Sequence, residues 1–249
     1  MKNLAIVVLA AGKGKRMKSG DLPKVLIPLR EKPLLGHVLE NLEDIKPEKI
    51  ILVVGHLKDK VKDYARKLND DKITFADQDE QLGTGHAVMQ AEDELENFEG
   101  DVLILAGDVP LLTTKTLDRF ISEHKKNNAD VSVLSTTAPD PDGYGRIVRD
   151  KEGNFTKITE HKDADEDTKK IDEINSGIFL VEKNTLVNSL KNVSNKNAQG
   201  EYYLTDIVDI LKSKDKPVFA FNLADFKELQ GVNSPEDLKR AEKVYLEMK

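Results

Sequence analysis

The sequence contains no cysteine, which excludes disulfide bonds and metal sites built from thiolate ligands. This absence is compatible with any redox compartment. The histidines also lack the spacing of a metal site, and we assign none of them to catalysis: His37, His56, His86, His124 and His161. The sequence therefore gives no reason to expect a transition-metal centre.

Long apolar runs are missing as well. The first run, at residues 4–9, is too short to cross a bilayer and shorter than the hydrophobic region of a typical signal peptide. No later segment approaches the roughly 18 apolar residues of a membrane span. Internal repeats and low-complexity tracts are absent too. We therefore expect a cytoplasmic protein with no membrane partner.

The charge balance is negative overall and positive locally. A net charge of −7 disfavours nonspecific binding to nucleic acid or to acidic membranes, so no nucleic-acid partner is expected. Five cations nevertheless fall between residues 13 and 24: Lys13, Lys15, Arg16, Lys18 and Lys24. This cluster indicates a phosphate-rich ligand, although Lys15 and Lys18 could equally be ordinary solvated lysines.

A glycine loop follows the first apolar run. Small residues continue from Ala10 to Gly14, and backbone N–H groups at such a loop can turn together toward an anion. The dinucleotide-binding motif fails here because Met17 stands where glycine or alanine is needed, and the Walker motif fails because no Gly-Lys-Ser/Thr follows. The remaining pattern, G-x-G-x-R-M with a downstream L-P-K, indicates a nucleoside triphosphate site, against the alternative of an ordinary strand-to-helix turn.

Strands and helices alternate through the first half of the chain. Apolar runs predict strands at residues 4–9, 50–54, 73–75 and 102–105, and helical patterns occupy 58–68 and 84–95. This order predicts an α/β fold with parallel βαβ units and helices on both faces of the sheet. Residues 12–16, 78–84 and 107–108 each follow a predicted strand, so we expect these loops to converge beyond the carboxyl ends of the strands.

The pattern changes after residue 138. A turn-rich segment leads to shorter strand candidates at 145–149 and 155–159, and then to a polar loop at 162–172. Near the end, Ser234 and Pro235 predict a capped helix over residues 235–247.

The glycine loop and seven later motifs resemble the sugar-1-phosphate nucleotidyltransferase family, in particular its members that act on N-acetylglucosamine 1-phosphate. The motifs are QLGTGHA (81–87), GDVP (107–110), GYGR (143–146), EHKDA (160–164), EINSG (173–177), QGEYYLTD (199–206) and GVN (231–233). They occur in the family's order and cover nearly the whole chain. Two departures are Gly20, an extra residue before the L-P-K, and Ala106, where the family often has tyrosine.

The resemblance implies the family's nucleotide-diphospho-sugar transferase fold, a Rossmann-like mostly parallel sheet with a smaller β-rich sugar-binding lobe. Within a single domain at 1–249, it implies a nucleotide-binding part at about 1–137, the lobe at about 138–230, and a metal-ligand turn with the terminal helix at 231–249. No hexapeptide repeat is present, so we expect no left-handed β-helix acetyltransferase domain, and the oligomeric state stays open.

The implied reaction is Mg2+-dependent transfer of UMP from UTP to N-acetylglucosamine 1-phosphate, giving UDP-N-acetylglucosamine and pyrophosphate. A phosphate oxygen can attack the α-phosphorus without a protein nucleophile, which fits the lack of a convincing nucleophile and base. Two alternatives remain: the same chemistry with glucose or N-acetylgalactosamine 1-phosphate, and a regulatory module that binds nucleotide sugars without turnover.

The resemblance also assigns site residues. They are Arg16 and Lys24 as catalytic cations; Leu9, Ala10, Ala11, Gly12, Gln78, Gly83, Thr84, Ala106 and Gly107 at the nucleotide; Gly143, Glu160 and Asn175 at the sugar, with Tyr203 and Thr205 as weaker candidates; and Asp108 and Asn233 as ligands of Mg2+. From the residues alone, Gln78 could be an ordinary surface side chain, Asp108 a turn residue and Asn233 part of a helix entry.

Overall fold

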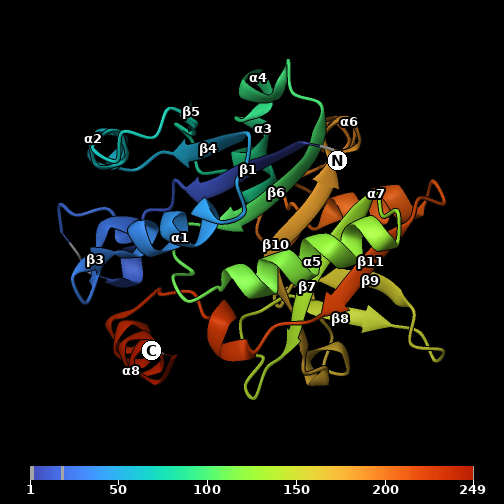
Figure 1. Cartoon of the computed structure of the whole chain (residues 1–249). Helices are drawn as coiled ribbons and strands as arrows, with labels where there is room; N and C mark the ends of the chain where they lie inside the picture. The colour runs from blue at the N-terminus through green and yellow to red at the C-terminus, as the bar shows by residue number, and fades with distance from the viewer. Residues whose placement is uncertain (1–2, 18–19, 249) are drawn as a thin grey trace.

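The computed structural model describes residues 3–17 and 20–248 (Figure 1), so Lys18, one of the cations expected to supply charge, lies outside the described residues. The strands are β1 (Asn3–Ala10), β2 (Pro28–Leu29), β3 (Lys32–Pro33), β4 (Lys49–Val54), β5 (Ile73–Asp77), β6 (Gly100–Ala106), β7 (Val131–Thr137), β8 (Arg146–Arg149), β9 (Phe155–Thr159), β10 (Glu173–Glu182) and β11 (Val218–Asn222).

The helices connect these strands. The α-helices are α1 (Leu34–Glu43), α2 (Lys58–Arg66), α3 (Thr84–Met89), α4 (Glu92–Leu95), α5 (Thr114–Lys126), α6 (Lys183–Leu190), α7 (Asp206–Lys212) and α8 (Pro235–Met248). The short 3₁₀ helices are η1 (Lys15–Met17), η2 (Lys24–Leu26), η3 (Thr168–Lys170) and η4 (Phe226–Leu229). No helix in the described part of the chain is long and apolar enough to span a membrane.

One mixed sheet forms the centre of the molecule. Its strand order is β11-β7-β10-β6-β1-β4-β5. The pairs of β1 with β4 and β6, of β4 with β5, and of β7 with β11 are parallel. Strand β10 runs antiparallel between β6 and β7, and β8 and β9 extend the sheet from β10. The predicted α/β class with a mostly parallel sheet is confirmed.

Both faces of the sheet are covered by helices, as Figure 1 shows. Along β1, Ala5 and Val7 belong to one apolar cluster, which also contains buried residues of α3, α6 and α7. Ile6 and Val8 belong to the cluster on the other face, with buried residues of α1, α2 and α5. A strand buried on both sides must be apolar throughout, which explains the continuous apolar run at the start of the sequence.

The carboxy-terminal helix α8 returns to the amino-terminal part of the chain. Ala241 and Val244 pack with Met17, Leu29 and Leu34 in a third apolar cluster. In Figure 1, α8 accordingly lies near β3 and α1. The Ser234 hydroxyl accepts a hydrogen bond from the Asp237 N–H at 3.2 Å, which confirms the predicted cap. This packing carries the loop before α8 to the segment after β6, where the Val232 N–H donates to the Asp108 carbonyl at 2.9 Å.

One helix prediction is wrong in its extent. The single helix expected at residues 84–95 is divided into α3 and α4. At the break, the Ala91 N–H donates to the Val88 carbonyl at 3.0 Å, three residues back, so the chain tightens into a turn.

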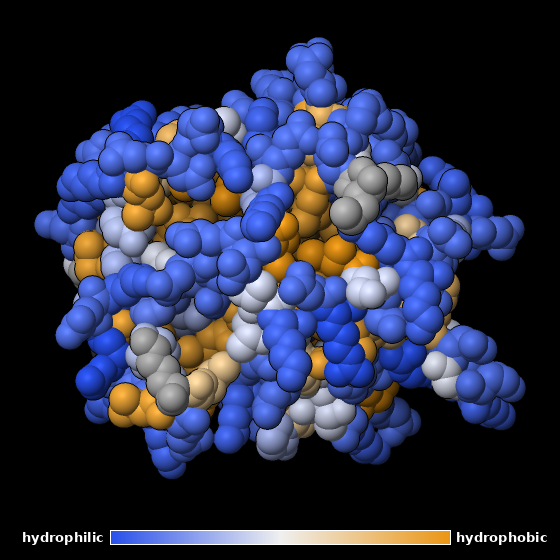
Figure 2. Space-filling model, in the orientation of Figure 1, coloured by the Kyte–Doolittle hydropathy of each residue, from blue (hydrophilic) through white to orange (hydrophobic). Residues whose placement is uncertain are grey.

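The face of the molecule in Figure 2 is largely hydrophilic, and apolar residues show mainly in recesses between polar side chains.

Candidate active site

Four parallel strands end in line. In the sheet register, Leu9 of β1 lies beside Ala106 of β6, Ala10 beside Val54 of β4, and Val54 beside Asp77 of β5. The loops that follow these strands therefore start at one edge of the sheet. This is the edge at which ligands bind in open α/β sheets, and it carries the predicted glycine loop, Gln78 and Asp108.

The glycine loop is shaped by Lys24. Gly14 has φ +57°, and a Cβ at this position would lie 2.7 Å from Cβ of Lys24. A larger residue at position 14 would be strained and would displace the stem of that lysine. The Gly14 carbonyl accepts a hydrogen bond from the Met17 N–H at 2.9 Å, which starts the turn η1. Arg16 lies in this turn with an exposed side chain.

A first cavity, of about 300 Å³, opens beside the glycine loop. Its lining consists of Leu9, Ala10, Ala11, Gly12, Lys24, Val25, Gln78, Gln81, Gly83, Thr84, Ala87, Ala106, Asp108 and Glu201. Nearly all the residues expected at the nucleotide are in this set. Gly107 lies outside it, and its N–H donates to the Leu9 carbonyl at 2.9 Å, which joins the ends of β6 and β1.

The glycine turn at 82–85 packs against a distant segment. Gly83 has φ +113°, and a Cβ there would lie 2.5 Å from the Tyr202 carbonyl oxygen. The N–H of Tyr202 donates to the Leu82 carbonyl at 2.8 Å, and the N–H of Gly85 donates to the Tyr202 carbonyl at 2.8 Å. The motifs QLGTGHA and QGEYYLTD are thus two sides of one wall of the first cavity.

A second cavity, of about 420 Å³, adjoins the first and shares Ala106 and Asp108 with it. Arg16, Gly143 and Asn233 also line it. Further charged groups on its wall are Asp140, Asp142, Asp237 and Arg240. Carboxylates thus outnumber arginines in this lining, so an anionic ligand entering it needs additional positive charge.

Lys24 joins the two expected metal ligands. Its ammonium group forms an ion pair with Asp108 Oδ2 and donates to Asn233 Oδ1 at 2.9 Å. The Lys24 and Asp108 side chains are only 14% and 13% exposed, so the pair is shielded from water. Two oxygen ligands far apart in sequence therefore face the same cation.

This donor set fits Mg2+. Magnesium prefers carboxylate and carbonyl oxygens and usually completes its shell with water and substrate phosphates. Asp108 and Asn233 would supply two such oxygens at the point where the cavities meet. Within the described residues no group of three His, Cys, Asp or Glu side chains could hold a metal, so the protein part of this site would be small.

Three of the residues expected at the sugar, Glu160, Asn175 and Thr205, lie close to one another. Glu160 Oε1 accepts a hydrogen bond from Thr205 Oγ1 at 3.1 Å. A Cβ on Gly145 would lie 3.4 Å from Glu160 Oε2 and 3.5 Å from Cβ of Asn175. Burial raises the pKa of Glu160, while the bond from Thr205 opposes this change. Glu160 and Asn175 are not in the lining of the second cavity, whereas Gly143 and Ser176 are.

Tyr203, a weaker sugar candidate, is held within the same region. Its hydroxyl donates to Asp163 Oδ2 at 3.2 Å and accepts from Gln199 Nε2 at 2.9 Å. These contacts hold the Tyr203 hydroxyl between Asp163 of the EHKDA motif and Gln199 at the start of the QGEYYLTD motif.

Comparison with known protein families finds one family that matches more than half of the chain. Residues 6–164 match the MobA-like NTP transferase domain. The chain belongs to this family. The membership confirms the predicted resemblance to nucleotidyltransferases and the expectation of a transferase enzyme.

Curated relatives of the family extend the match over nearly the whole chain. It is 45% identical over 244 residues to the bifunctional protein GlmU of Latilactobacillus sakei, covering 98% of this chain and 52% of the relative. It is 47% identical over 244 residues to the bifunctional protein GlmU of Streptococcus pyogenes, covering 98% of this chain and 57% of the relative. The chain spans about half the length of the curated relatives that it matches.

Solved structures show the same fold. A UDP-glucose pyrophosphorylase complexed with UDP-glucose superposes with a TM-score of 0.80 at 18% identity and covers 100% of both chains. HddC from Yersinia pseudotuberculosis gives a TM-score of 0.70 at 25% identity, over 98% of this chain and 100% of that chain. The fold class of the family is therefore confirmed.

Some residues of the second cavity had no sequence-based assignment. Asp237 Oδ2 accepts the Asn233 N–H at 3.0 Å, and its other oxygen pairs with Arg240. Asp237 therefore holds the turn that presents Asn233. The sequence carried a partial signal, because a carboxylate three residues after a Ser cap can reach back to the backbone N–H groups at the start of the helix.

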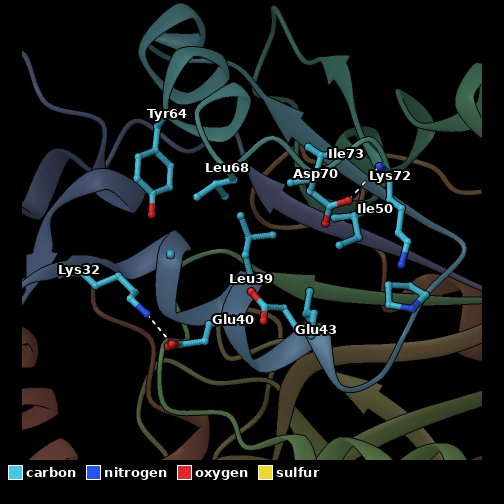
Figure 3. A pocket seen from close by; sticks show the side chains of 13 residues that line it. Lys32, Leu39, Glu40, Glu43, Ile50, Tyr64, Leu68, Asp70, Lys72 and Ile73 are labelled. Carbon is cyan, nitrogen blue, oxygen red and sulfur yellow. Dashed lines mark hydrogen bonds and ion pairs between the residues drawn. The ribbon is translucent and has the colours of Figure 1, made fainter.

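A third cavity, of about 300 Å³, lies away from these motifs, between α1, α2 and the first residues of β4 and β5 (Figure 3). Leu39, Leu68 and Ile73 contribute apolar surface, and Lys32 and Glu40 form an ion pair of 2.6 Å at its rim. Among the described residues, its lining includes none of the predicted site residues.

Proposed function

We propose that this chain transfers UMP from UTP to N-acetylglucosamine 1-phosphate in a Mg2+-dependent reaction. The observation that carries the proposal is the junction of two cavities at Asp108. One is lined by the residues expected at the nucleotide, and the other contains Arg16, Gly143 and Asn233. Two substrates bound in them would meet beside the proposed cation ligands.

The chemistry balances without a protein nucleophile. An oxygen of the sugar phosphate forms a new bond to the α-phosphorus of UTP, and the bond from that phosphorus to the oxygen bridging to the β-phosphate breaks. The leaving group is pyrophosphate. The protein has to position the two phosphates and offset their negative charge.

Each charged group has a proposed part in this reaction. Arg16 would contact the departing pyrophosphate, for which its planar fork is suited, and Lys24 would contact phosphates at the reacting centre. Asp108 and Asn233 would hold Mg2+, which when bound supplies positive charge to the phosphate oxygens. The existing contact of Lys24 with both ligands supports a cation position at this point.

The proposed sugar contacts rest on the group around Glu160. Its carboxylate and the amide of Asn175 are suited to hydroxyl and N-acetyl groups. Thr205 holds one oxygen of Glu160, which leaves the other, Oε2, near Gly145 as an acceptor for a hydroxyl. The order of the motifs from QLGTGHA to GVN, which resembles that of family members acting on N-acetylglucosamine 1-phosphate, supports this sugar over others.

Pyrophosphate release tests the proposal. Purified protein is assayed with UTP and N-acetylglucosamine 1-phosphate, with and without Mg2+, in parallel with glucose 1-phosphate and N-acetylgalactosamine 1-phosphate. We expect rapid release only with the first sugar and only with the metal. Preference for another sugar would contradict the proposed substrate, and metal-independent release would contradict the proposed Mg2+ dependence. Nucleotide binding without any release would indicate a binding module.

A further inference from the structure

The two proposed metal ligands lie on segments that are distant in sequence. Asp108 belongs to the loop between β6 and α5, and Asn233 belongs to the loop between η4 and α8. The loops touch beside the ligands, where the Val232 N–H donates to the Asp108 carbonyl at 2.9 Å. One hydrogen bond leaves two segments free to pivot about it, so this contact alone does not fix the spacing of the ligand oxygens.

Glu228 joins the same two segments at a second point. Its Oε2 accepts hydrogen bonds from the Thr113 N–H at 3.1 Å and from the hydroxyl groups of Thr113 and Thr116, each at 2.7 Å. Thr113 is the N-cap of α5, where the first N–H groups of the helix lack backbone partners and a negative charge is favourable. The Glu228 carboxylate is therefore bound to the first turn of a 13-residue helix.

The backbone around Glu228 is fixed as well. Asp225 Oδ1 accepts the Lys227 N–H at 2.9 Å, and the Asp225 carbonyl accepts the Glu228 N–H at 3.0 Å, which forms the turn η4. The next residue, Leu229, is 3% exposed and belongs to the apolar cluster that includes buried residues of α5. The turn η4 is therefore held as one unit, and the chain that follows it leads directly to Asn233.

The contact of Glu228 with Thr113 lies equally far along the chain from both ligands. Thr113 follows Asp108 by five positions, and Glu228 precedes Asn233 by five. Glu228 is not in the lining of either cavity, so it acts through other residues. We infer that Glu228 is a positioning residue that fixes the spacing of Asp108 and Asn233 and thereby sets the affinity of the site for a divalent cation. The inference rests on the proposed function, which makes these two residues the metal ligands.

The affinity should depend on this spacing because the protein supplies few ligands. Mg2+ requires near-ideal octahedral geometry, so a ligand oxygen whose position varies contributes little to binding. Replacement of a residue that orients metal ligands from outside commonly lowers metal affinity by about tenfold to a hundredfold. Loss of the Glu228 contact should therefore weaken metal binding although both ligands remain.

The test measures Mn2+ binding to the substrate-free protein, from the loss of the electron paramagnetic resonance signal of the free ion. Mn2+ takes the same oxygen ligands as Mg2+. In Glu228→Leu all three hydrogen bonds are lost, and we expect Mn2+ to bind about tenfold more weakly than to the wild type. Glu228→Gln retains a side-chain oxygen as acceptor and should bind Mn2+ nearly as well as the wild type.

Two further variants serve as controls. Thr114→Val removes a hydroxyl from the same turn of α5, but this hydroxyl donates to the Asn41 carbonyl at 2.8 Å, so the Mn2+ affinity should not change. Asp108→Asn removes a proposed ligand and should weaken Mn2+ binding. Equal Mn2+ affinities of Asp108→Asn and the wild type would contradict the proposed metal site and overturn the inference with it.

A purely structural role for Glu228 would lower the melting temperature of Glu228→Leu and leave the Mn2+ affinity of the folded protein unchanged, which would overturn the inference. If Glu228→Leu does not fold, the double variant Thr113→Val/Thr116→Val takes its place, because it removes both hydroxyl donors to Glu228. Wild-type Mn2+ affinity in this double variant would also overturn the inference.

Mn2+-supported pyrophosphate release supplies a second measurement. The Mn2+ concentration that gives half the maximal rate should rise in Glu228→Leu, whereas kcat at saturating Mn2+ should stay near the wild-type value. An unchanged Mn2+ requirement would overturn the inference and leave the proposed transfer reaction intact.

Discussion

Lys24 Nζ donates a hydrogen bond to Asn233 Oδ1 at 2.9 Å, although 209 positions separate the two residues in sequence. The same ammonium group pairs with Asp108. If Asp108 and Asn233 hold Mg2+ as proposed, the lysine and the metal compete for the same oxygens. A phosphate that draws Lys24 away would then favour metal binding.

Replacement of Lys24 should therefore strengthen metal binding in the substrate-free protein. We expect Lys24→Gln to bind Mg2+ about fivefold more tightly in calorimetric titrations, since a shielded ion pair of about 1 kcal/mol no longer has to break. Lys15→Gln removes the same charge from the same loop and should leave the affinity unchanged. Equal affinities of the two variants would show that Lys24 does not compete with the metal.

Arg16 should act mainly on turnover. Loss of a donor that binds charge in the transition state commonly lowers kcat by about 100-fold, so we expect this effect in Arg16→Ala. Arg16→Lys should also be impaired, because an ammonium group cannot reproduce the guanidinium fork. Arg119→Ala, an exposed arginine on α5, is the control. A kcat near the wild-type value in Arg16→Ala, measured by pyrophosphate release, would exclude the proposed contact of Arg16 with the departing pyrophosphate.

Substitutions at two glycines should affect the stability of the fold and the binding of nucleotide separately. Gly83→Ala forces a side chain into a left-handed backbone and against the Tyr202 carbonyl, so it should lower the free energy of unfolding by about 2–3 kcal/mol. A Cβ on Gly12 would meet no described atom within 4 Å, so Gly12→Ala should unfold like the wild type yet bind nucleotide more weakly. Urea unfolding and nucleotide titration measure both effects. Similar unfolding midpoints for the two variants would contradict this expectation.

Asp206 should make stability depend on pH. Burial, with the charges of Asp209 and Asp163, raises the pKa of this half-buried carboxyl from 3.8 to about 6. Between these values the folded state holds a proton that the unfolded state has lost, so stability falls as pH rises. Asp206→Asn removes this effect. Its stability relative to the wild type should rise from near zero at pH 4 to about 1 kcal/mol at pH 7, allowing for solvent screening. If the difference in stability between Asp206→Asn and the wild type does not change with pH, the raised pKa of Asp206 does not cause the pH dependence.

The parallel half of the fold could be predicted because its information is local. Residues 4–9 and 50–54 are apolar runs buried on both faces, and the loops that follow them must leave at one edge. Most of the residues that the resemblance assigns to the nucleotide line the first cavity. The division of the chain into nucleotide, sugar and metal segments, and the part of each residue, stay predictions.

The antiparallel half could not be predicted in the same way. Strand β10 pairs with β6 and β7, and a bulge between Asn175 and Ile178 interrupts its register, so neither its partners nor its alternation is visible locally. The contact of Lys24 with Asn233 depends on α8 returning to the third apolar cluster. The contacts of the Gln78 amide with the Gly83 carbonyl and with His86 depend on the folded turn at residues 82–85.

The most direct test of the proposed reaction is the mass of the product formed from UTP, N-acetylglucosamine 1-phosphate and Mg2+. We expect UDP-N-acetylglucosamine with an equal amount of pyrophosphate from the wild type, and almost none from Asp108→Asn at the same protein concentration. Recovery of both substrates unchanged from folded wild-type protein that binds UTP would contradict the proposed transfer.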